Sequence, residues 1–116
     1  MRVDPRALAA DALSALGGIE RRIVAYDQDR FLADDDMRFI VERLYNMLGE
    51  ALNALSKALP AASAKISALP TIVSFRNILV HRYRHINPEI VFAVAKNETE
   101  SLIAILESLM AELEGA

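Results

Sequence analysis

The stretch DDMRFIVERLYNMLGEALNALSKAL, residues 35–59, decides the fold class of this chain. Its apolar residues recur at steps of three and four, which is the period of one helix face. The predicted core face consists of Met37, Ile40, Val41, Leu44, Leu48, Ala51, Leu52 and Leu55. Asp34, Asp35 and Asp36 supply a cap and negative charge where the helix begins, and Pro60 ends it. The stretch therefore predicts one long amphipathic helix.

A second amphipathic helix is predicted upstream, from about Asp4 to Tyr26. Asp4 suits the N-cap and Pro5 suits the first helical position. The apolar stripe of this helix consists of Leu8, Ala12, Leu16, Ile19, Ile23 and Tyr26. The Gly17–Gly18 pair weakens the middle of the helix and indicates a kink or a close contact with another helix.

Turn and breaker residues divide the rest of the chain. Residues 27–30 are expected to form a polar loop, which a hydrophobic anchor at Phe31 and Leu32 follows. Two further helices are predicted, over about residues 71–84 and 87–114. The inward-facing residues of the last helix are Val91, Val94, Leu102, Ile105, Leu109 and Leu113.

The connections between these helices are short, which makes successive helices antiparallel neighbours. The chain is therefore predicted to be all-α, an up-and-down helical bundle of four main helices in a single domain, residues 1–116. The small-residue stretch 61–69 leaves room for a short fifth helix.

The composition of the chain excludes several kinds of site and classes of protein. The chain is 53% apolar and has no Cys, which excludes disulfides and thiolate metal sites. No signal-peptide core follows Met1, and no apolar run approaches the roughly 20 residues that span a bilayer. A soluble cytoplasmic protein without a membrane partner is expected. The net charge of -3 argues against a generic nucleic-acid coat protein.

The chemistry-bearing residues gather in SFRNILVHRYRH, residues 74–85. This stretch holds both histidines, three arginines and a tyrosine, and it has no acidic residue. A local positive spot on an acidic chain suits one anionic ligand site, although a solvated helix end would look the same. Arg76 and His81 are five residues apart, about 140° around a helix. One regular helix therefore does not aim both at one atom, so the helix end unwinds or another surface completes the site.

The pattern Arg76-Asn77-x-x-x-His81-x-Tyr83 resembles the extended motif of HepT proteins, a branch of the HEPN family. Two upstream stretches agree in order and spacing with that family. Phe31-Leu32-Ala33-Asp34 resembles the entry to its second helix, and Leu48-Gly49-Glu50-Ala51-Leu52 resembles a step inside it.

The resemblance implies a metal-independent endoribonuclease toxin that works as a homodimer, with two motifs facing one cleft. It implies that Arg76 and His81 are catalytic and that Asn77 supports them. No metal and no cofactor are implied, and the substrate is RNA. A nucleotidyltransferase antitoxin would neutralise the toxin by transferring AMP to Tyr83.

Two positions depart from the family pattern. Many relatives have a Trp shortly before the motif Arg, and here residues 69–73 contain no aromatic residue. Position 82 is often acidic in relatives, and here it is Arg82. Together with Arg84, this arginine makes the site more basic, which could aid RNA or phosphate binding or alter recognition by a partner.

Each motif residue also has a purely structural interpretation. His81 could stabilise a helix C-terminus, where a cation is favoured. Arg76 could form an ion pair with Glu50 or Asp34, and Tyr83 could close the end of the bundle.

Two other functions stay open on the sequence. The chain could be a non-catalytic helical module that docks a nucleotidyltransferase and presents a substrate or nucleotide to it. It could also be a plain structural helical protein, in which Arg82, Arg84 and His85 are solvated surface residues.

Overall fold

Three long helices and one short helix make up the part of the chain that the structure, a computed structural model, describes: residues 4–61 and 87–115. The helices are α1 (Pro5–Ile23), α2 (Gln28–Ala33), α3 (Asp35–Ala58) and α6 (Pro88–Gly115). Within these residues the chain is helical and contains no strand. This confirms the prediction of an all-α bundle. The predicted helix over residues 71–84 and the possible short helix in 61–69 lie outside the described residues, apart from Ala61.

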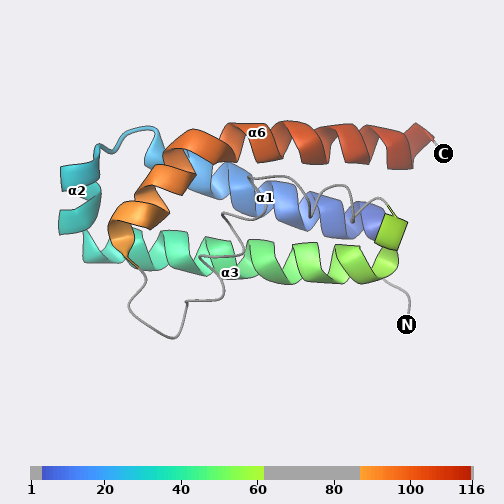
Figure 1. Cartoon of the computed structure of the whole chain (residues 1–116), viewed down its shortest axis with the longest axis horizontal. Coiled ribbons are helices and arrows are strands. Elements are labelled where there is room, and N and C mark those ends of the chain that lie inside the picture. Colours follow the sequence, from blue (N-terminus) through green and yellow to red (C-terminus); the bar gives the residue numbers. More distant parts are fainter. Residues whose placement is uncertain (1–3, 62–86, 116) are drawn as a thin grey trace.

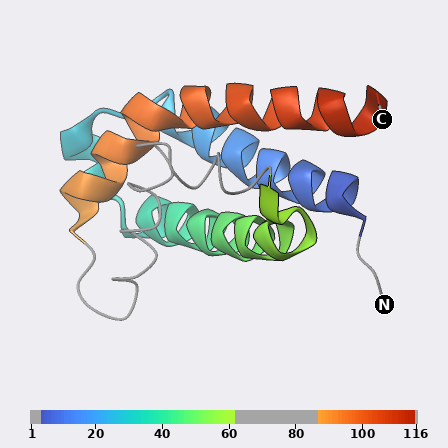
Figure 2. The same ribbon diagram turned by 45° about the vertical axis from the view of Figure 1, so that its right-hand side comes forward.

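Helix α1 lies between α3 and α6, and the short α2 closes one end of the bundle (Figures 1 and 2). The end of α3, the start of α1 and the C-terminus lie at the opposite end. Helix α6 is bent in its first half (Figure 1). There the Thr99 hydroxyl is buried and donates to the Ala95 carbonyl at 2.7 Å. Such a bond back to the preceding turn is a common cause of helix bending.

The helix starts follow from their caps. The Asp4 side chain accepts a hydrogen bond from the Arg6 amide at 2.9 Å, and Pro5 occupies the first turn. Asp34 caps α3 by accepting from the Met37 amide at 3.0 Å. The Asn87 side chain accepts from the Glu89 amide at 2.9 Å where α6 begins. The expected caps at Asp4 and Asp34 are thus confirmed.

Two predicted boundaries are wrong. The stretch 27–30, expected as a loop, holds the start of α2, because the Asp27 side chain accepts from the Arg30 amide at 2.8 Å and nucleates a helical turn. Helix α1 ends at Ile23, before Tyr26. The Tyr26 side chain still packs against the core from the turn that follows.

The apolar stripes form one shared core. All six stripe residues of the first predicted helix face it, and five of them are buried. On α3 the prediction errs at two positions: Ile40 is 40% exposed, whereas Tyr45, which was not assigned to the core, is 1% exposed. On α6, Leu106 is buried and Ile105 is only half-buried.

The glycine pair of α1 marks a close helix contact. A Cβ atom on Gly18 would lie 3.2 Å from both terminal methyl carbons of Leu44 on α3. A Cβ atom on Gly17 would meet only the tip of the Arg21 side chain, at 3.4 Å. Gly18 therefore lets α1 and α3 approach, whereas Gly17 faces a flexible side chain.

Substitutions at the two glycines are expected to have opposite signs. Gly17→Ala should raise the free energy of unfolding by about 0.5–1 kcal/mol, because Ala is the better helix former and little must move. Gly18→Val should lower it by about 1–3 kcal/mol, because the added methyls displace Leu44. Urea unfolding of both variants checks this, and equal effects of the same sign would contradict it.

Candidate functional site

The sequence places its candidate site in one segment. Arg76, Asn77, His81, Tyr83 and the two arginines at 82 and 84 all fall within residues 62–86. These positions lie outside the described residues, so their roles stay predictions. The structure describes the helices on either side of this segment, α3 before it and α6 after it.

The two points at which the described chain stops before this segment and resumes after it lie far apart along the bundle. After α3, the Leu59 amide donates to the Leu55 carbonyl at 2.9 Å, and the described chain stops at Ala61. It resumes at Asn87, where α6 begins beside α2 at the opposite end of the bundle (Figure 1). At that end Phe92 of α6 packs on Phe31 of α2, with ring centroids 5.3 Å apart.

A polar junction joins α1, α2 and α3 at the same end of the bundle. The Tyr26 hydroxyl donates to Asp34 Oδ2 at 2.6 Å, while Asp34 Oδ1 caps α3. The Arg30 guanidinium lies 4.5 Å from the centre of the Tyr26 ring and donates to the Ala25 carbonyl. Arg38 hydrogen-bonds Asp35 and the Leu32 carbonyl. These contacts hold the turn after α1, helix α2 and the start of α3 against one another.

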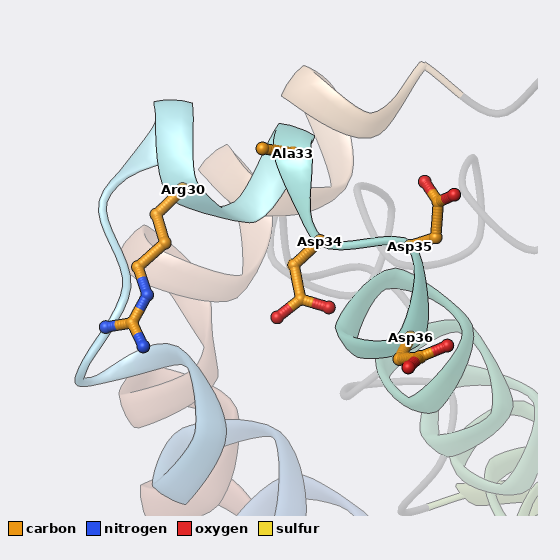
Figure 3. A pocket seen from close by; sticks show the side chains of 5 residues that line it. All are labelled: Arg30, Ala33, Asp34, Asp35 and Asp36. Carbon is orange, nitrogen blue, oxygen red and sulfur yellow. The ribbon is translucent and has the colours of Figure 1, made fainter.

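An open hollow lies at this junction, lined by Arg30, Ala33, Asp34, Asp35 and Asp36 (Figure 3). Asp35 points away from Asp34 and Arg30. Both Asp34 oxygens already accept hydrogen bonds. Among residues 4–61 and 87–115, no group of three or more His, Cys, Asp or Glu side chains is placed to hold a metal ion. We therefore assign the hollow a structural role.

Hydrogen bonds shift the acidity of Asp34. The Tyr26 hydroxyl and then the Met37 amide hold the pKa of its carboxyl below the usual value. A depressed folded-state pKa stabilises the fold above the unfolded-state pKa of about 4, and this contribution is lost as the pH falls through the folded-state value.

Asp34→Asn should therefore weaken the acid dependence of stability. Asparagine can still cap α3 but no longer titrates. The free energy of unfolding, measured between about pH 5 and pH 2, should fall less steeply than in the unsubstituted protein. An unchanged slope in Asp34→Asn would contradict the role of this carboxylate.

One buried polar pair was missed by the sequence analysis. Glu98 of α6 lies near Tyr45 of α3. The Glu98 Oε2 atom is buried and has no hydrogen-bond partner among the residues that the structure describes. Burial raises the pKa of the Tyr45 hydroxyl far above its usual value, and the Glu98 carboxylate raises it further. Tyr45 is therefore a neutral hydroxyl at physiological pH. No sequence signal marked the pair, because Glu98 sits in a polar run that resembles a solvated face.

Both acids that could pair with Arg76, Asp34 and Glu50, lie among the described residues. Asp34 is engaged by Tyr26 and by the start of α3. Glu50 is exposed on α3 and forms no ion pair with another residue of the described ranges. Of the two, Glu50 is the more available carboxylate.

Comparison with known proteins identifies the family. The family model described as Ribonuclease HepT-like matches residues 12–109, which covers most of the chain and includes the whole motif segment. No curated protein and no solved structure gives a match. No helix within the described ranges is long and apolar enough to cross a membrane. The match over residues 12–109 shows that the chain belongs to the HepT-like ribonuclease family.

Proposed function

We propose that this chain is a toxin of the HepT type, a metal-independent endoribonuclease that acts as a homodimer. The observation that carries the proposal is the Arg76-Asn77-x-x-x-His81-x-Tyr83 motif inside the range that the family model matches. The all-α bundle of the described residues fits this assignment. The family resemblance implies two copies, and a second copy would complete a site that a single regular helix does not form, because Arg76 and His81 lie about 140° apart on it.

The proposed reaction is an internal transfer within RNA. One His81 imidazole accepts the proton of a 2′-hydroxyl, whose oxygen attacks the adjacent phosphorus. The bond from phosphorus to the 5′-oxygen breaks, and the His81 imidazole of the second copy gives that oxygen a proton. Arg76 stabilises the charge on the phosphorane, and Asn77 orients His81 or holds a phosphate oxygen. The products are a 2′,3′-cyclic phosphate and a free 5′-hydroxyl.

Arg82 and Arg84 are proposed to bind RNA phosphates outside the scissile bond. Arg82 lies inside the motif, Arg84 directly follows it, and residues 74–85 contain no acidic residue. Contacts of this kind add affinity and make it fall as the salt concentration rises.

The decisive experiment is cleavage of defined RNAs by the purified protein in excess chelator. Cleaved RNA with cyclic phosphate ends supports the proposal. Intact RNA in all conditions, combined with tight binding of a nucleotidyltransferase, would instead support the non-catalytic docking module.

Regulation is proposed to act on Tyr83. A nucleotidyltransferase antitoxin would transfer AMP from ATP to the Tyr83 hydroxyl oxygen, releasing pyrophosphate. A bulky anion two residues from His81 would block RNA by size and by charge. Mass spectrometry of the protein co-expressed with such a partner should find the adduct on Tyr83, and an unmodified peptide would contradict this regulation.

A further inference from the structure

The outer face of α3 carries apolar side chains that the described bundle leaves uncovered. Phe39 is 65% exposed, Ile40 is 40% exposed and Met47 is 41% exposed. They lie within about 100° of arc on the side of α3 that faces away from the core. We define the α3 outer face as these three residues together with the charged residues of the same arc: Asp36, Arg43, Glu50 and Lys57.

The charges of this face alternate in sign at a spacing of seven residues. Asp36 is negative, Arg43 positive, Glu50 negative and Lys57 positive. None of the four forms an ion pair with another residue of the described ranges; the ion pairs there join Arg6 to Asp4 and Arg38 to Asp35. Helix-end electrostatics can explain an acid at position 36 and a lysine at position 57. It does not explain the two charges in the middle of the helix.

A second copy of the same helix matches this pattern in one closed arrangement. In an antiparallel pair with its two-fold axis between Asn46 and Met47, position 43 lies opposite position 50. Arg43 then faces Glu50 of the partner subunit, and Asp36 faces Lys57 of the partner subunit. The two-fold axis repeats both pairs, so all four charges on each helix meet an opposite charge.

Other arrangements fit less well. A parallel pair in register would place like charges opposite each other. A parallel pair shifted by seven residues would match the charges but would leave a helix end unpaired and generate an open chain of copies. The heptad spacing drifts by about 20° per repeat, which suits the shallow crossing of two packed helices.

We propose that the α3 outer face is a homodimer interface in which two copies of α3 pack antiparallel. The proposal deepens the function proposed above, which needs two copies, by naming the surface that joins them. Its apolar centre supplies contact area, and its charge pattern selects the two-fold register.

A charge exchange tests the register. Sedimentation velocity of the full chain over a range of concentrations should show a dimer. Arg43→Glu places two acids opposite each other at both symmetric positions, so the dimer dissociation constant should rise by at least about tenfold. The double variant Arg43→Glu with Glu50→Arg should restore the dimer. Arg21→Glu, an exposed change on α1, is the matched control and should leave the constant unchanged.

The apolar centre has its own matched pair of variants. Phe39→Asp should also produce monomers, whereas Val24→Asp, at an equally exposed apolar side chain off this face, should not. Circular dichroism confirms that each variant is folded.

A dimer that tolerates Arg43→Glu and Phe39→Asp would overturn this interface and leave the proposed nuclease intact. An unsubstituted chain that is monomeric at every concentration would overturn the interface and the two-copy active site together. RNA cleavage by such a monomer would show that the nuclease needs no second copy.

Discussion

A His81→Ala protein is expected to lose RNA cleavage by about 10²- to 10⁴-fold, the usual contribution of general acid–base catalysis. In the proposed dimer the substitution removes both the group that accepts the 2′-hydroxyl proton and the group that protonates the leaving oxygen. A loss toward the upper end of that range is therefore expected. The measurement is single-turnover cleavage of a defined RNA in chelator, with the enzyme in excess.

The pH dependence sharpens this test. If one imidazole acts as base and its two-fold mate as acid, the cleavage rate should pass through a maximum as the pH changes and fall on either side of it. In His81→Ala the residual rate should lose this peak. His85→Ala, four residues away and outside the motif, should keep both the rate and the profile. Full activity in His81→Ala would refute the proposed mechanism.

The helical stripes could be predicted because burial repeats with the helix period. The five buried stripe residues of α1 follow from spacing alone. So do the seven predicted ones that are buried on α3 and α6: Val41, Leu48, Ala51, Leu55, Val91, Leu102 and Leu109. Spacing cannot choose between adjacent apolar residues, however. Ile105 and Leu106 both continue the stripe from Leu102, and only the packing against α1 selects the second.

The spacing of apolar residues could not predict which polar residues lie in the core. Tyr45 was not assigned to the core, although it is buried and fills the interior beside Glu98. The start of α2 was missed because acidic and amide residues were interpreted as a loop. The same Asp27 side chain that favours a turn also caps a helix.

The candidate site could be predicted only by its motif. Helical geometry indicates that Arg76 and His81 do not converge on one regular helix. The two-copy site is implied by the resemblance to HepT proteins and fits this geometry. The charge pattern of the α3 outer face was not recognised in the sequence, because exposure is needed to separate it from the core stripe. Once the buried side of α3 is known, the charges that alternate in sign from Asp36 to Lys57 can be assigned to its exposed side.

Phe31→Ala is expected to cause the largest loss of stability of any substitution argued for this chain, about 3–5 kcal/mol of unfolding free energy. Phe31 is fully buried and packs on Phe92 with ring planes at 46°. Helix α2 has only six residues, too few to be stable without tertiary contacts. Phe31 is its one buried residue, so the truncation removes the anchor that holds α2 against α6.

The measurement is urea unfolding followed by circular dichroism. Leu32→Ala is the control. Leu32 is half-buried and lies next to Phe31 on the same short helix, so its truncation should lower the free energy of unfolding much less. A loss below about 1 kcal/mol in Phe31→Ala would show that α2 is not anchored through this ring. Phe92 lies five residues after Asn87, where the described chain resumes beyond the motif segment. We therefore expect RNA cleavage by Phe31→Ala to fail at a lower temperature than cleavage by Leu32→Ala, because the end of the bundle at which the described chain resumes comes apart first.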